Sequence, residues 1–264
     1  MDISEWQAGW QLWDLISHLQ DCGALASGLM FRGQANADWK LIPALYRRPI
    51  HLFSDEHSQE ELYVMAERRM LNSFFDRAML MLPQFDRNEV VDRVIAQHYG
   101  VPTQLIDWTL DPFIGLYFAV SDEREADADA ALYYVGSMSR IVEIPNVEFP
   151  FRNRLTKIFP PVLDERIRTQ KSVFTMQSFG GAEEFVPLDD RTLKVSEAGE
   201  GSDPADEVSA FGKVVIPRTQ RVQILGQLLD MGIDASLMFP GLQGIGDRIA
   251  AHARMKNYGG DGLF

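Results

Sequence analysis

The order of helix-type and strand-type hydrophobic patterns constrains the fold of this chain more than any other feature. Helix-type periodicity dominates the first half, and most short apolar runs typical of strands lie in the second half. A doubly wound parallel sheet needs strands and helices in regular alternation, so it is not favoured. We therefore predict an α+β fold with a helical N-terminal half, built as a single domain over residues 1–264.

Capping and breaking residues bound the helical patterns. Ser4 is a candidate N-cap for a stripe of three tryptophans, Trp6, Trp10 and Trp13, which favours core packing over a ligand-binding box. Helix ends are expected at Pro83, Gly100 and Gly232, with Pro112 in a first turn and a break at Pro240-Gly241. The expected helices span residues 4–19, 59–81, 88–98, 111–121, 218–231 and 234–255.

The strand patterns are short. Strands are expected over residues 29–33, 132–135, 140–144, 173–176 and 213–216, and a loop or irregular strand over residues 102–109. Residues 123–129 are acidic and predict an exposed turn, and residues 197–206 have the composition of a mobile loop.

Composition excludes several classes of protein. The net charge of −13 is opposite to what a duplex-coating protein needs, although a local basic cleft can lie on an acidic body. The single cysteine, Cys22, excludes an intramolecular disulfide and favours a small buried residue over a nucleophile. No apolar run approaches the roughly 18 residues of a membrane span, and the N-terminus lacks a signal-peptide pattern. We expect a soluble cytoplasmic protein.

Common catalytic and nucleotide-binding motifs are missing from the sequence. There is no G-x-G-x-x-G after a strand, no Walker lysine motif and no G-x-S-x-G elbow. The five histidines form no i, i+4 pair and have no cysteine partner, which argues against a zinc site.

One candidate site segment is Phe31-Arg32-Gly33-Gln34, followed by a loop rich in aromatic and basic residues. An arginine at a strand end can grip a phosphate in a fork, and the glycine lets a ligand approach the backbone. The alternative is a structural arginine paired with one of the 38 acidic residues.

A second candidate segment covers residues 97–119. Its polar residues, including His98, Thr103, Asp107 and Thr109, alternate with aromatic residues such as Trp108, a mixture that can line a pocket for a ring and a sugar. The alternative is structural: Asp107 caps or braces the next helix start, and His98 is a satisfied, partly buried imidazole.

These two segments resemble the FRG domain family, named after the Phe-Arg-Gly triplet found here at residues 31–33. The run Gln-His-Tyr-Gly-Val-Pro-Thr-Gln-Leu-Ile-Asp-Trp-Thr at residues 97–109, with the following Leu-Tyr-Phe-Ala, is similar to that family's second block. Residues 166–174 and 239–245 resemble two further blocks, which places the motif core at about residues 29–250.

The resemblance implies an ADP-ribosyltransferase-like fold, a single domain with a mixed, mainly antiparallel sheet. It implies NAD as co-substrate, a protein or nucleic-acid acceptor, and a toxin or phage-defence role with an antitoxin or defence-system partner. The implied catalytic residues are Arg32, Asp107 and Gln170, with Gln170 standing where a glutamate is expected. The implied NAD-binding residues are Arg32, Gly33, Gln34, His98, Tyr99, Thr103, Trp108, Thr109, Tyr117 and Phe174. A non-catalytic module that binds a nucleotide, nucleic acid or protein is the alternative, and a nucleotide or RNA hydrolase is a third reading.

Overall fold

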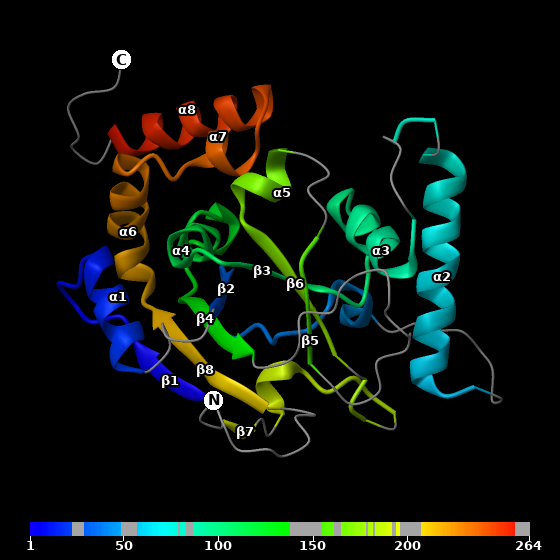
Figure 1. Cartoon of the computed structure of the whole chain (residues 1–264). Helices are drawn as coiled ribbons and strands as arrows, with labels where there is room; N and C mark the ends of the chain where they lie inside the picture. The colour runs from blue at the N-terminus through cyan, green and yellow to red at the C-terminus, as the bar shows by residue number, and fades with distance from the viewer. Residues whose placement is uncertain are drawn as a thin grey trace.

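A computed structural model describes residues 1–22, 29–48, 57–78, 80–82, 87–137, 155–160, 165–177, 179–181, 183–191, 194–195 and 207–256. Within these residues the chain forms an eight-stranded sheet in the order β1-β8-β4-β2-β3-β6-β5, with β7 also paired to β8 (Figure 1). The strands are β1 (Asp2–Glu5), β2 (Leu29–Gln34), β3 (Ile106–Thr109), β4 (Ala130–Ser137), β5 (Thr156–Ile158), β6 (Ser172–Met176), β7 (Lys194–Val195) and β8 (Glu207–Ile216). The strand expected at residues 140–144, the loop at 197–206 and the helix end at Pro83 lie outside the described residues.

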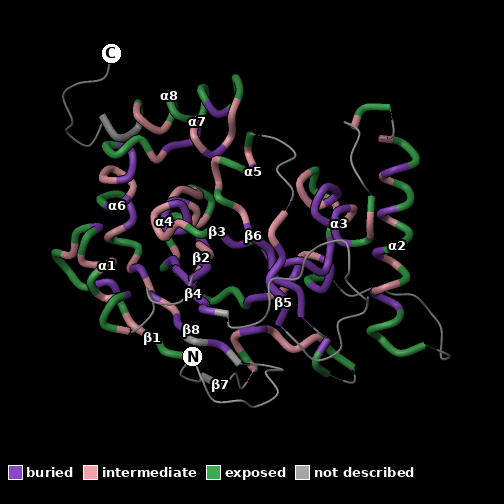
Figure 2. Tube along the Cα trace, viewed as in Figure 1, coloured by how far each residue is buried: buried purple, intermediate pink, exposed green. Residues whose placement is uncertain are grey.

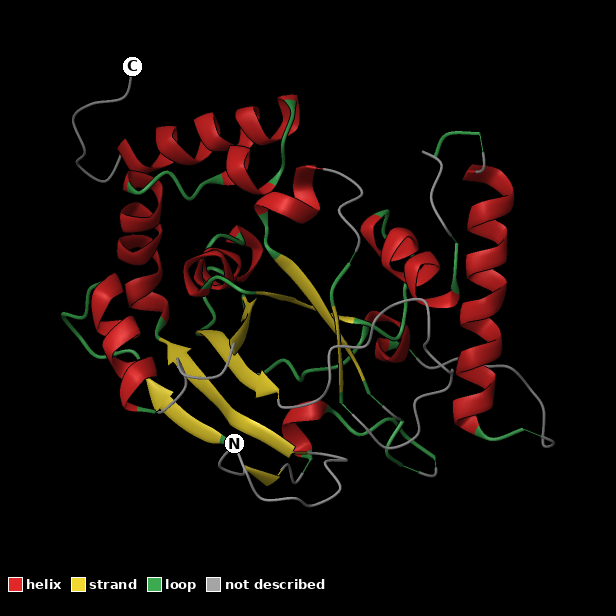
Figure 3. Ribbon diagram, in the orientation of Figure 1, coloured by secondary structure: helices red, strands yellow, loops and turns green. Residues whose placement is uncertain are grey.

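Strand pairing gives a mixed sheet that is mainly antiparallel. Among the described strands, five neighbouring pairs are antiparallel, and only β1 and β7 run parallel to their partner β8. The predicted α+β class is confirmed, and the helices lie around the strands of the sheet (Figure 3).

The helices are α1 (Leu12–Asp21), α2 (Gln59–Ala78), α3 (Glu89–His98), α4 (Pro112–Val120), α5 (Glu165–Thr169), α6 (Arg218–Asp230), α7 (Ala235–Met238) and α8 (Leu242–Lys256). Apart from α1, which begins later than predicted, and α5, which was not predicted, the helices begin and end close to the predicted positions. Asn88 and Asp111 cap α3 and α4 by accepting backbone N–H groups of the first turn. Gly100 and Gly232 follow their helices with φ of +87° and +77°, which favours glycine.

The N-terminal segment corrects one prediction. Residues 2–5 form β1 instead of the first turn of a helix, because they pair in parallel with β8, and Ser4 caps nothing. The helix begins only at Leu12, so the tryptophans do not share one helical face: Trp6 is 2% exposed, whereas Trp13 is 69% exposed. The first half also contributes β2, β3 and the start of β4, so a helical N-terminal half is not confirmed.

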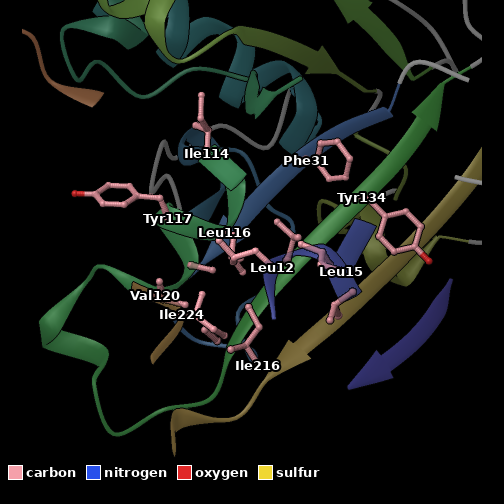
Figure 4. Close-up of a cluster of buried hydrophobic side chains, with 14 of the residues drawn as sticks. Leu12, Leu15, Phe31, Ile114, Leu116, Tyr117, Val120, Tyr134, Ile216 and Ile224 are labelled. Atoms are coloured by element: carbon pink, nitrogen blue, oxygen red, sulfur yellow. The ribbon is translucent and has the colours of Figure 1, made fainter. Parts of the chain in front are cut away.

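The main core lies between one face of the sheet and the helices α1, α4 and α6. Its side chains include Phe31 of β2 and Tyr134 of β4 (Figure 4). A second cluster occupies the opposite face and contains Met30 of β2 and Trp108 of β3. Buried residues follow the central strands, whereas α2 exposes one side to solvent and α8 is exposed along most of its length (Figure 2). Among the described residues, no helix combines the length and apolar composition needed to cross a membrane.

Helix α4 crosses β2 at backbone contact, and Gly33 makes this possible. A Cβ at Gly33 would lie 2.0 Å from the Gly115 carbonyl oxygen and 2.4 Å from the Ala119 nitrogen. Gly115 in turn faces Phe31 and Leu132, where its own Cβ would lie 3.0 and 2.9 Å from their atoms. The glycine of the Phe-Arg-Gly triplet therefore serves helix–strand packing, a role that the ligand-approach reading of the sequence did not include.

We predict that Gly33→Ala lowers the free energy of unfolding by about 1–3 kcal/mol or more, because the helix backbone cannot yield as a flexible side chain does. Chemical denaturation measures the change. Gly246→Ala is the matched control, since nothing lies within 4 Å of its Cβ position on α8. That control should gain about 0.5–1 kcal/mol of stability from better helix propensity. Equal effects of the two substitutions would contradict the close approach of α4 to β2.

Candidate functional site

The candidate site is a cavity of about 710 Å³ at the place where β2 and β3 diverge. The two strands are neighbours, yet their register contains a single pair, Phe31 with Thr109, whereas β2 and β4 share six pairs. From that point β3 runs across to β6, with which it pairs over its whole length (Figure 1). The sheet is therefore split between β2 and β3, and side chains of both strands line the opening together with residues of α3, α4 and α5.

Arg32 spans this split. Its Nη1 donates a hydrogen bond to the Asp107 carbonyl oxygen at 2.7 Å and lies 3.8 Å from the Asp107 carboxylate. A side chain of β2 thus binds the backbone of β3 where no ladder pair forms. Arg32 also lines the cavity. It therefore both joins the two strands and belongs to the candidate site, and these are the two interpretations that the sequence left open.

The electrostatics around Arg32 favour an anion. Burial lowers the pKa of Arg32, the Asp107 carboxylate raises it, and the nearby cation Arg47 lowers it again. The guanidinium stays charged across the physiological range because its intrinsic pKa is so high. Arg47 lines the same cavity, donates Nε to the Ile42 carbonyl oxygen at 3.1 Å and forms no ion pair within the described residues. Two arginines in one cavity can be satisfied together by a phosphate-bearing ligand.

Asp107 is not a helix cap, because it lies within β3 and Asp111 caps α4 instead. Its side chain is 56% exposed, and Oδ1 accepts a hydrogen bond from Gln97 Nε2 at 2.5 Å. The Thr103 hydroxyl in turn donates to Gln97 Oε1. Thr103 is fully buried and does not line the cavity, so it braces Gln97 instead of facing a ligand.

Gln170 lines the cavity, but its amide is used in the fold. Nε2 donates to the Met238 carbonyl oxygen of α7 at 2.8 Å, and the Gln170 backbone oxygen accepts from the Thr109 hydroxyl at 2.7 Å. These bonds tie the start of β6 to β3 and to the C-terminal helices. No glutamate is among the described residues that line the cavity. Across all the residues that the structure describes, no cluster of His, Cys, Asp and Glu is arranged to hold a metal.

The aromatic residues divide into three groups. Trp108 and Phe174 border the cavity, but they are only 3% and 5% exposed and belong to core clusters. Tyr99 and Tyr117 do not line the cavity. Tyr99 is 59% exposed, whereas Tyr117 lies in the main core, at one end of the cluster in Figure 4. Trp39, on the loop after β2, lines the cavity with 46% of its surface exposed.

The cavity therefore brings together most of the predicted site residues, namely Arg32, Gly33, Gln34, His98, Asp107, Trp108, Thr109, Gln170 and Phe174. Three predicted residues, Tyr99, Thr103 and Tyr117, lie outside its lining. Sequence reasoning missed Trp39, Lys40, Arg47, Gln97, Phe118 and Arg166, which also line it. The aromatic and basic composition of the loop after β2 was the only signal for the first three.

Fold and site together define an α+β protein with a cavity, lined by charged, polar and aromatic residues, at a split in its sheet. Residues 27–128 match the family model of the FRG domain, so the chain carries an FRG domain, as the motifs indicated. The match covers β2, α3, β3 and α4, which supply Arg32 and Asp107, while Arg166 and Gln170 lie beyond it. No curated protein and no solved structure matches the chain.

We predict that Trp108→Ala destabilises the protein by about 3–5 kcal/mol, as expected for a buried aromatic side chain. Trp108 Nε1 also donates to the Thr175 hydroxyl at 2.8 Å. Thr175→Val should therefore cost about 1–3 kcal/mol, because it leaves the buried indole N–H without an acceptor. Denaturant titration of both variants checks these values, and a change below about 1 kcal/mol for Trp108→Ala would remove Trp108 from the core.

Proposed function

We propose that this FRG domain is a cytoplasmic NAD-dependent ADP-ribosyltransferase that modifies a macromolecular acceptor. The observation that carries the proposal is the convergence of Arg32 and Asp107, from strands 75 residues apart, on one cavity. A volume of about 710 Å³ lies within the range of roughly 300–1,000 Å³ found for small-molecule and cofactor sites.

Each part of the co-substrate has a counterpart in the cavity. The diphosphate suits Arg32 and Arg47, which are cations with several donors each. Ribose hydroxyls suit the imidazole of His98, and the aromatic residues of the lining suit a planar ring. Asp107 supplies a carboxylate that is accessible and held in place by Gln97.

In the proposed reaction, the ADP-ribosyl group passes from nicotinamide to the acceptor. The bond between ribose C1′ and the nicotinamide nitrogen breaks, and its electron pair leaves with nicotinamide. The acceptor's nucleophilic atom forms the new bond to C1′ and gives its proton to the Asp107 carboxylate. The same carboxylate stabilises the positive charge that develops on the ribose, as carboxylates do in glycoside hydrolysis.

The order of the blocks supports an ADP-ribosyltransferase-like arrangement. An Arg-Gly pair lies on β2, a threonine-bearing β3 leads into α4 with its Phe118-Ala119, and a late polar residue, Gln170, precedes β6. The family resemblance implies a part in bacterial and phage conflict, so the proposed role is a toxin or phage-defence effector, held by an antitoxin or a defence-system partner.

A non-catalytic binding module is the second candidate. It is favoured by the amide of Gln170, which stands where a catalytic glutamate is expected and is bound to the Met238 carbonyl oxygen. A glutamine cannot accept a proton as a base does, so binding without turnover is the outcome if Asp107 does not take that role.

We predict that the protein releases nicotinamide from NAD and labels an acceptor in cell lysate, and that Arg32→Ala loses both activities. The reason is the loss of the cation facing the diphosphate. Calorimetry should show NAD and ADP-ribose binding to the wild-type protein and not to Arg32→Ala. Arg248→Ala is the matched control, since Arg248 is an ion-paired arginine outside the cavity. Absence of heat and of thermal shift at millimolar NAD would reject the transferase.

We also predict that Asp107→Asn retains NAD binding and loses nicotinamide release. The asparagine oxygen can still accept from Gln97, so the loss would report the charge and basicity of the carboxylate. Asp247→Asn is the control, because Asp247 also accepts from a glutamine, Gln243, at 2.9 Å on exposed α8. Full turnover by Asp107→Asn, with unchanged melting temperatures in both variants, would assign the base to another residue.

A further inference from the structure

The loop after β2 holds Trp39 in a fixed position at the cavity. The buried Arg221 donates to the carbonyl oxygens of Ala35 and Ala128, joining this loop to the turn that follows α4. Lys213 of β8 donates to the Ala37 carbonyl oxygen at 2.5 Å, and the Tyr133 hydroxyl donates to the Trp39 carbonyl oxygen at 3.3 Å.

The far end of the loop is held in the same way. The Leu41 N–H donates to the Asp189 carboxylate at 2.9 Å, and Lys40 forms an ion pair with Asp190 at 2.6 Å. The backbone around Trp39 is thus bound from β4, β8, α6 and the 3₁₀ turn Leu188–Asp190. Because this backbone is held, little backbone entropy remains to be lost when a ligand binds at Trp39, whose residue surface is 46% exposed.

Gln34 lies beside this loop and has an unused acceptor. Its Nε2 donates to the Lys40 carbonyl oxygen at 3.4 Å, and since a carbonyl only accepts, this contact fixes the orientation of the amide. Gln34 is 5% exposed and lines the cavity, and its Oε1 accepts no hydrogen bond within the described part of the chain. Buried acceptors without a protein donor are rare because they are costly, so Gln34 Oε1 is a candidate acceptor for a donor that enters the cavity.

The other aromatic residues of the cavity have little exposed surface on which a ligand ring could stack. Phe31, Trp108 and Phe174 are each at least 95% buried in core clusters. Phe118 is half-buried and lies edge-on to Tyr117 and Phe239. Among the described aromatic residues that line the cavity, Trp39 is the most exposed.

We propose that Trp39 and Gln34 form the ring-recognition subsite of the cavity, specific for a planar heteroaromatic ring with an exocyclic amino group. The ring stacks on the indole of Trp39, and the amino group donates to Gln34 Oε1. Adenine has this chemistry through the amino group on its ring, and nicotinamide has it through the NH2 group of its carboxamide. The inference rests on the dinucleotide binding proposed above and adds the group that the subsite selects.

Calorimetry with three dinucleotides tests the subsite and identifies the ring. The probes are NAD, its nicotinic acid analogue and its hypoxanthine analogue, each of which replaces one amino group by oxygen. The analogue that alters the ring bound at Gln34 should bind about tenfold or more weakly than NAD, and the other analogue should bind like NAD. Gln34→Met should bind all three alike. Equal binding of the three by the wild-type protein overturns the inference.

Variants of Trp39 test the stacking. Trp39→Ala should weaken NAD binding about ten- to hundredfold, and Trp39→Phe should retain most of the affinity. Trp13→Ala is the matched control, because Trp13 is 69% exposed and lies outside the cavity. Thermal melts accompany each titration, and an unchanged affinity in folded Trp39→Ala overturns the inference.

Two outcomes separate this inference from the proposed transferase. NAD binding that needs Arg32 but neither Trp39 nor Gln34 overturns the subsite and leaves the transferase in place. Binding of AMP or nicotinamide mononucleotide that needs Trp39 and Gln34, without nicotinamide release from NAD, supports the subsite and overturns the transferase.

Discussion

The contact between α4 and β2 at Gly33 is the constraint on which the rest of the site depends. Because the helix backbone lies directly on the strand, α4 occupies one face of β2 and Phe31 fills the space beneath it. The intervening residue, Arg32, then points to the other face, as alternate residues of a strand do. The three residues of the Phe-Arg-Gly triplet thus serve core packing, bridging of the split and the close approach of a helix, in that order.

The split in the sheet turns a structural cation into a site residue. Where β2 and β3 diverge, the Asp107 carbonyl oxygen accepts from the Arg32 guanidinium instead of a strand N–H. Anchoring at one nitrogen leaves the guanidinium with further donors for a ligand. Asp107, Gln97 and Thr103 extend the same network toward α3, so the geometry of the carboxylate depends on a threonine that no ligand needs to touch.

Much of the secondary structure follows from local signals in the sequence. Asn88, Asp111 and Gly232 act at helix ends as their residue types predict, because a cap depends on a few neighbouring backbone groups. The wrong prediction of a helix from residue 4 has a long-range cause instead of a local one. Residues 2–5 are extended because β8 offers a strand edge to pair with, and that partner lies more than 200 residues away in the chain.

The sequence by itself determined the family, most helix limits and the two segments that meet at the cavity. It also placed Arg32 and Asp107 among the candidate residues. Only the tertiary structure decided which aromatic residues line the cavity, because the packing of helices and loops around the split sets where each ring lies. Tyr117 turns into the core and Tyr99 lies outside the lining. Trp39 lines the cavity because side chains of β4, β8 and α6 hold its loop. Such long-range contacts leave no local periodicity in the sequence, so no pattern in the loop could have indicated its orientation.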